Sequence, residues 1–125
     1  MRKILLIDDL RFFHVFWMQG LRKHFQFFHA TTVEEARRIF HSHLSLAAIV
    51  VDAHMGGKMA SYYGRPFREW GLDTSDLITE FKLRFTGPII AAPSQPWHFK
   101  PMMAAGCTHG VWKWAVSPLL KKLLI

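Results

Sequence analysis

A chain of 125 residues is long enough for one domain with a real hydrophobic core, and half of its residues are apolar. Charged residues make up 20%, so the composition excludes a disordered chain, and a single cysteine, Cys107, excludes an internal disulfide. The formal charge is +7, but no run of Lys and Arg is longer than two residues, which indicates a scattered basic excess rather than a nucleic-acid footprint.

The beginning of the chain shows no secretory signal. Its first apolar run, residues 4–7, is broken by Asp8 and Asp9 and is too short for the hydrophobic region of a signal peptide. No apolar stretch approaches the length of a membrane span. Together with the single cysteine, these features lead us to expect a cytoplasmic protein.

Apolar runs alternate with helical periodicity along the whole chain. The runs typical of buried strands are residues 2–7, 26–30, 46–52, 89–92 and 111–114. The helices that we expect cover residues 10–25, begin at residues 32 and 74, and cover residues 101–105 and 119–125. This alternation predicts an α/β domain in which helices cover both faces of a doubly wound, five-stranded parallel sheet.

Several of these helices carry terminal signals. Thr32 and Glu35 have the spacing of a capping box, so a helix is expected to start there. Gly106 is expected to end the fourth helix. Ser117 followed by Pro118 is typical of a helix N-terminus, and the short C-terminal helix that follows would have about two turns.

The segment after the third strand is longer than a strand-to-helix connection requires. It combines glycines and a proline with the aromatic residues Tyr62, Tyr63, Phe67 and Trp70. Loops of more than about 12 residues in compact domains are usually functional or mobile. We therefore expect an extended loop at about residues 56–71 whose aromatic side chains pack against another surface.

Charged residues stand at the ends of three apolar runs. Asp8 and Asp9 follow the first run, Asp52 ends the third, and Lys113 lies at the end of the last. The carboxyl ends of parallel strands meet at one edge of a sheet, where α/β proteins bind their ligands. Three carboxylates on one rim repel one another without a cation, so the cluster suits one divalent cation and one phosphoryl group.

Five segments in chain order carry a resemblance to a known family. They are residues 3–9, 31–36, 50–55, 87–92 and 104–113. With these segments the chain resembles, over nearly all of its length, a response-regulator receiver domain, the phosphoacceptor module of two-component signalling. The resemblance implies a flavodoxin-like receiver fold and a single receiver-like domain at residues 1–125.

The resemblance also implies a role for each residue of the rim. Asp52 would accept a phosphoryl group from a histidine kinase or a histidine phosphotransfer protein, and Lys113 would bind the phosphoryl oxygens. A magnesium ion would be held by Asp9 and Asp52 directly, by Asp8 through water, and by the backbone carbonyl of His54. Mg²⁺ is a hard cation that prefers oxygen ligands and phosphate, which agrees with this set of residues.

The sequence departs from the family at three positions near the site. The family's serine or threonine on the fourth strand falls on Pro93, and Ser94 completes the site if a bulge or a shifted turn brings it in. The aromatic position three residues before the lysine is Gly110. Trp114 replaces the proline after the lysine, and we expect a trans bond or a rearranged loop because a cis bond to a non-proline costs about 2.5–4 kcal/mol.

Three functions remain open at this point. The first is a stand-alone receiver, a phosphoacceptor and not an enzyme, that signals to a downstream protein partner or relays the phosphoryl group. The second is a pseudo-receiver that acts as a phosphorylation-independent adaptor, which the altered positions favour. The third is a nucleic-acid-binding domain, which bulk charge alone favours.

Overall fold

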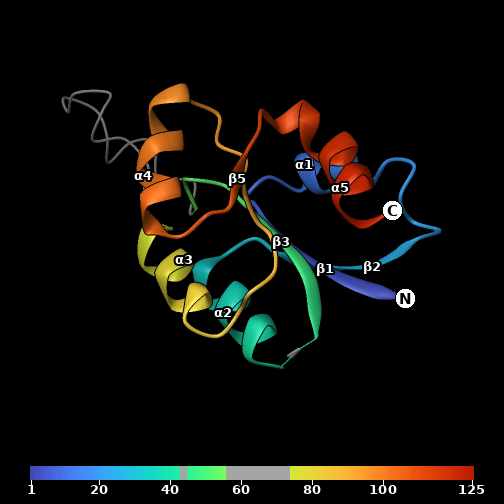
Figure 1. The fold of residues 1–125 in the computed structure, drawn as a ribbon, viewed down its shortest axis with the longest axis horizontal. Helices are drawn as coiled ribbons and strands as arrows, with labels where there is room; N and C mark the ends of the chain where they lie inside the picture. Colours follow the sequence, from blue (N-terminus) through green and yellow to red (C-terminus); the bar gives the residue numbers. More distant parts are fainter. Residues whose placement is uncertain (43–44, 56–73) are drawn as a thin grey trace.

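The computed structural model describes residues 1–42, 45–55 and 74–125. Their strands form one five-stranded sheet in the order β2-β1-β3-β4-β5, and every neighbouring pair is parallel (Figure 1). This is the order of the flavodoxin-like doubly wound fold, so the predicted fold class is confirmed. The extended loop predicted at about residues 56–71 lies outside the described residues.

The elements follow one another as strand and helix, as the periodicity predicts. The strands are β1 (Arg2–Ile7), β2 (Phe25–Ala30), β3 (Leu46–Val51), β4 (Ile89–Ala91) and β5 (His109–Gly110). The α-helices are α1 (Arg11–Met18), α2 (Val33–Ser42), α3 (Ser75–Lys82), α4 (Phe99–Ala105) and α5 (Val116–Leu124), and two short 3-10 helices are η3 (Pro96–His98) and η4 (Lys113–Ala115).

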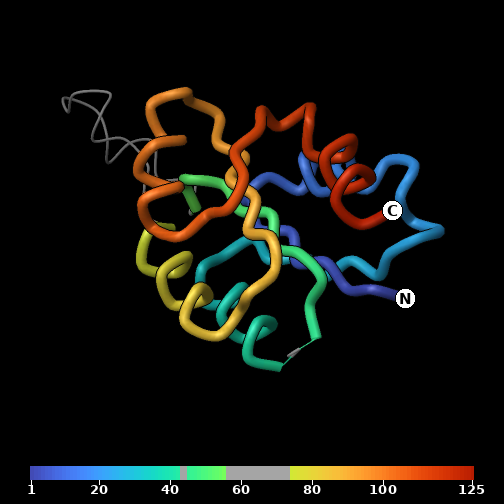
Figure 2. The backbone as a smooth tube through the Cα atoms, viewed as in Figure 1, coloured from blue at the N-terminus to red at the C-terminus, as the bar shows by residue number. Residues whose placement is uncertain are grey.

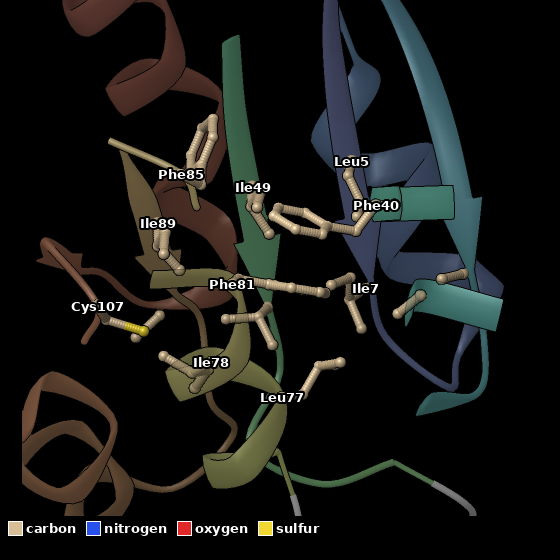
Figure 3. Close-up of a cluster of buried hydrophobic side chains, with 14 of the residues drawn as sticks. Leu5, Ile7, Phe40, Ile49, Leu77, Ile78, Phe81, Phe85, Ile89 and Cys107 are labelled. Atoms are coloured by element: carbon tan, nitrogen blue, oxygen red, sulfur yellow. The ribbon is translucent and has the colours of Figure 1, made fainter. Parts of the chain in front are cut away.

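Alternate residues of the strands enter two separate cores, one on each face of the sheet. On the α2–α3 face, Leu5, Ile49 and Ile89 pack with Phe40 and Phe81, whose rings stack with centroids 4.2 Å apart (Figure 3). The core on the α1–α5 face contains Ile4, Leu6, Trp17, Leu21, Val50, Ile90, Val116 and Leu120. Burial on both faces explains why the strands read as continuous apolar runs.

Both chain ends lie on the side of the molecule away from α4 (Figure 2). There Arg2 donates a hydrogen bond of 3.0 Å from Nη1 to the carbonyl oxygen of Leu124, which joins the first strand to the last helix. Within the described ranges, no helix combines the length and the apolar character needed to cross a membrane.

The first helix is shorter than predicted. It ends at Met18 rather than near residue 25, because Gly20 has a φ of 76°, a left-handed conformation that glycine adopts without strain and that stops a helix. The apolar spacing continues to Leu21, which is fully buried in the same core although it lies outside the helix. The apolar spacing of the sequence therefore predicted the burial of Leu21 correctly, although the helix ends before it.

The end of the chain also differs from the prediction. β5 is His109–Gly110, not residues 111–114, because the chain turns into η4 at Lys113. α5 begins at Val116, and Ser117 donates to the carbonyl oxygen of Gln19 (3.1 Å) instead of capping the helix. Pro118 is tolerated in the first turn, where backbone N–H groups have no intrahelical acceptor.

The predicted signals at α2 and α4 are confirmed. The backbone N–H of Glu35 donates to Thr32 Oγ1 (3.1 Å), and Glu35 Oε1 accepts from the backbone N–H of Thr31 (2.8 Å), so the reciprocal bond of the capping box reaches one residue further back. Gly106 follows α4 with a φ of 136°, in the region that favours glycine.

Candidate metal and phosphoacceptor site

The carboxyl ends of two neighbouring strands bring the acidic residues together. β1 and β3 are paired from Ile4 to Ile7, and the backbone N–H of Asp52 donates to the carbonyl of Ile7 at 2.9 Å. One carboxylate oxygen from each of Asp8, Asp9 and Asp52 lies within 4.8 Å of the others. The sheet register therefore produces the cluster that the strand ends predict.

Lys113 reaches this cluster from the opposite end of the sequence. Its Nζ lies 2.6 Å from Asp8 Oδ2 and 3.0 Å from Asp52 Oδ1, and all three residues are at most 5% exposed. The remaining oxygen of Asp8 accepts from the backbone N–H of Leu10 (2.9 Å), and Asp52 Oδ1 also accepts from the N–H of Ala53 (2.9 Å). Backbone N–H groups and the Lys113 ammonium group thus hold the carboxylates of Asp8 and Asp52.

Burial is the largest influence on the pKa values of Asp8 and Asp52. Desolvation raises the pKa of Asp8 to about 7, with the Asp52 carboxylate adding to the rise and Lys113 opposing it. Desolvation likewise raises the pKa of Asp52 to about 6 against the lowering effect of Lys113. Both values lie above the ordinary range for aspartate, so a single ammonium group does not fully stabilise the ionised pair.

The donor set fits a small divalent cation. When all three carboxyls are ionised, they and one ammonium group leave two negative charges unbalanced, and a divalent cation would neutralise them. Closely spaced carboxylate oxygens are the hard ligands that Mg²⁺ prefers. His54, whose carbonyl is the predicted fourth ligand, is half-buried and is the third residue after the end of β3, and its role stays a prediction.

Aromatic side chains from α1 enclose Lys113. Its Nζ lies 4.5 Å from the ring centroid of Phe13 and 5.4 Å from the ring of Trp17. The indole N–H of Trp17 donates a buried hydrogen bond of 2.9 Å to the backbone carbonyl of Lys113. The sequence gives no sign of this contact, because the two residues are 96 positions apart.

Two hydrogen-bonded histidines, His14 and His29, lie beside the backbone of Asp8. His14 Nε2 lies 2.8 Å from the backbone oxygen of Asp8, so this nitrogen must donate, and the opposite nitrogen Nδ1 accepts from His29 Nδ1 at 2.9 Å. Burial lowers the pKa of both imidazoles, which favours these neutral forms. His14 is 2% exposed and lies on α1 three residues before Trp17, so this histidine belongs to the buried face of the helix.

Thr74, where the sequence predicts the start of a helix, is a further residue that contacts the site. It is fully buried, and its hydroxyl lies 2.8 Å from the carbonyl oxygen of Asp52 and 3.2 Å from that of Ala53. No side-chain cap bond to α3 is present. The hydroxyl instead joins the start of α3 to the backbone of the candidate phosphoacceptor.

The structure describes all three positions at which the sequence departs from the receiver family. Pro93 is buried and Ser94 is exposed at the bend after β4, and among the described residues no hydrogen bond joins Ser94 to the acidic cluster. Phe99 from α4 lies against Gly110. The described peptide bonds are all trans, the bond before Trp114 included, as expected. A role for Ser94 remains a prediction.

No protein-family model matches the sequence, and no curated protein sequence matches it. Solved structures do match the fold. A two-component response regulator from Clostridium difficile matches with a TM-score of 0.74 at 18% identity, covering 98% of this chain and 91% of that chain. The chemotaxis protein CheY4 of Vibrio cholerae matches with a TM-score of 0.71 at 15% identity over 99% of both chains.

A third similar structure contains ligands. A response regulator from Burkholderia pseudomallei, solved with a phosphorylated aspartic acid, a calcium ion and citrate, matches with a TM-score of 0.73 at 19% identity, covering 100% of this chain and 67% of that chain. These likenesses show that the chain has the fold of response-regulator receiver domains, as its resemblance to that family implies.

Proposed function

We propose that this chain is a stand-alone receiver that accepts a phosphoryl group on Asp52 and signals through protein contacts. The observation that supports this most strongly is the carboxylate cluster at the ends of β1 and β3, with Lys113 bonded to both Asp8 and Asp52. The fold and the cluster agree with the receiver motifs of the sequence. We further propose that residues 1–125 form one such domain, without catalytic turnover of its own, in the cytoplasm.

The chemistry is a transfer of one phosphoryl group between two nucleophiles. A carboxylate oxygen of Asp52 attacks phosphorus and forms an acyl phosphate, while the P–N bond of a phosphohistidine donor breaks. The electron pair of that bond stays on the donor imidazole. Such transfers depend on positioning and on charge neutralisation at the phosphoryl oxygens, and Lys113 supplies one positive charge next to Asp52.

Mg²⁺ is the proposed cofactor. Asp9 and Asp52 would bind it directly, Asp8 through water, and the backbone carbonyl of His54 would complete the protein ligands. The ion would neutralise the charge that gathers on the carboxylates and the phosphoryl oxygens. The structure from Burkholderia pseudomallei, which has a phosphorylated aspartic acid and a calcium ion, supports a divalent cation in this fold.

The proposed donor is a histidine kinase or a histidine phosphotransfer protein, which would dock beside the rim on α1. Three apolar side chains on or next to this helix are exposed: Leu10 directly before it, and Val15 and Phe12 within it, with Phe12 71% exposed. Exposed apolar groups next to a reactive site are typical of a protein interface. A downstream protein partner would read the phosphorylated state.

Tryptophan fluorescence tests the proposal, because Trp17 and Trp112 lie near Lys113. Wild type and Asp52→Asn are titrated with magnesium and then with magnesium plus beryllium fluoride, a phosphoryl mimic. We expect a saturable change that requires both ions and Asp52. Magnesium binding without any response to the mimic would reject the phosphoacceptor function.

A phosphorylation-independent adaptor is the second candidate. The exposed position of Ser94 and the absence of a side chain at Gly110 favour it, since the family couples its site to the surface through these two positions. In this case neither ion would change the fluorescence of the wild type.

A further inference from the structure

Lys113 lies beyond the part of the chain that the sheet holds. β5 ends at Gly110, and the last backbone bond to β4 is from the N–H of Val111 to the carbonyl of Ala91 (2.9 Å). The chain then turns through η4, which begins at Lys113. A lysine two residues past the last sheet bond needs another anchor to keep its ammonium group against two carboxylates.

The indole of Trp17 provides that anchor. Its N–H donates to the carbonyl oxygen of Lys113 at 2.9 Å, in a bond that is buried, and Trp17 itself is fully buried on α1. Removing such a donor would leave a buried carbonyl without its partner, which is a strong local penalty. The bond therefore fixes the backbone from which the Lys113 side chain extends.

Aromatic rings also limit where the ammonium group can go. The Nζ of Lys113 lies over the rings of Phe13 and Trp17, at 4.5 Å and 5.4 Å from their centroids. The faces of aromatic rings attract cations, by about 0.5–2 kcal/mol for each contact. The ammonium group thus contacts two carboxylates and two aromatic rings of α1.

We propose that Trp17 is a positioning residue, which holds Lys113 in line with Asp52 through its indole N–H. This inference rests on the proposed function, in which Lys113 binds the phosphoryl oxygens. Trp17 acts on the site through Lys113: its N–H holds the backbone of that residue, and its ring lies beside the ammonium group.

The test compares two binding events in Trp17→Phe, which keeps a ring but lacks the N–H. Calorimetry measures the affinity for Mg²⁺ alone and then for beryllium fluoride in saturating Mg²⁺. We expect the affinity for beryllium fluoride to fall about tenfold, as the loss of one buried hydrogen bond implies. The Mg²⁺ affinity should stay the same or rise, because a displaced ammonium group repels the cation less. Trp114→Phe, at an exposed side chain, is the matched control and should change neither affinity.

A loss of beryllium fluoride affinity without a loss of Mg²⁺ affinity distinguishes a positioning role of Trp17 from a general disruption of the site. An equal loss of both, or no loss of either, would overturn the inference. In a double-mutant cycle, Trp17→Phe should have no further effect on beryllium fluoride binding once Lys113→Met is present, and additive losses would also overturn it. A wild type that binds Mg²⁺ but not beryllium fluoride would instead reject the proposed function.

A second variant covers the case in which Trp17→Phe does not fold. Site-specific incorporation of benzothienylalanine at position 17 replaces the indole N–H with sulfur and keeps the volume of the ring. This variant should show the same selective loss of beryllium fluoride affinity. Unchanged affinity would show that the hydrogen bond does not position Lys113.

Discussion

The ring of Phe99 occupies the space beside Gly110. A Cβ atom on Gly110 would lie 2.8 Å from Cδ1 of Phe99, closer than side chains approach one another. Phe99 in turn meets Trp112 edge to face, with centroids 5.2 Å apart, and both line a surface pocket of about 340 Å³. An aromatic ring from α4 thus covers the position at which the receiver family carries its aromatic residue on the fifth strand.

Gly110→Ala should destabilise the protein by about 1–3 kcal/mol, because the new methyl group would overlap the Phe99 ring. Urea unfolding of the two proteins measures the difference. The same substitution in a Phe99→Ala background should have much less effect, since the obstructing ring is gone. An equal loss in both backgrounds would show that the ring does not fill this space.

The sequence predicts the sheet and the acidic rim well for a physical reason. Parallel strands buried on both faces are apolar throughout, so each run visibly ends where the first charge appears, at Asp8 and Asp52. The register then places these charges together without further information. The prediction for α1 is too long because apolar spacing indicates which residues are buried, not which are helical. Leu21 is buried but lies outside the helix.

Contacts between distant segments could not be predicted in this way. The bond from Trp17 to Lys113, the hydroxyl of Thr74 on the Asp52 carbonyl and the ring of Phe99 over Gly110 depend on three-dimensional packing. None of them follows from local periodicity or spacing.

The stability of the magnesium-free protein should fall as the pH rises. Folding raises the pKa of Asp52 to about 6 and that of Asp8 to about 7, so the folded state binds protons more tightly than the unfolded chain. This contribution is complete below the ordinary pKa of aspartate and is lost as the pH rises through 6 and 7. Urea unfolding between pH about 5 and about 8 measures the fall, which Asp52→Asn should reduce. Saturating Mg²⁺ should remove it, and a flat profile without the ion would contradict the expectation.

Lys113→Met should destabilise the protein by about 3–5 kcal/mol at a pH above both raised pKa values, because it leaves two buried carboxylates without their ammonium partner. The loss should shrink at lower pH, where Asp8 and Asp52 are protonated. Denaturant unfolding at both ends of this range gives the comparison. Adding Asp52→Asn should restore part of the stability. A loss that does not depend on pH would point to packing rather than charge.

Thr74→Val should cost about 1–3 kcal/mol of stability, because the buried carbonyls of Asp52 and Ala53 lose their hydroxyl donor while the side-chain volume is kept. Thr74→Ser keeps the hydroxyl and is the matched control. Thermal or urea unfolding measures both variants, and Mg²⁺ affinity should fall in the valine variant alone. Equal behaviour of the two variants would assign Thr74 a packing role instead.

The most direct test of the central claim is to identify the residue that takes up a phosphoryl group. The protein is incubated with Mg²⁺ and a small-molecule phosphodonor such as acetyl phosphate, and the intact mass is followed by mass spectrometry with borohydride trapping of the acyl phosphate. We predict the addition of one phosphoryl group, which maps to Asp52, requires Mg²⁺ and is lost in Asp52→Asn. A wild type that remains unmodified, or a modification that persists in Asp52→Asn, would contradict the assignment of Asp52 as the phosphoacceptor.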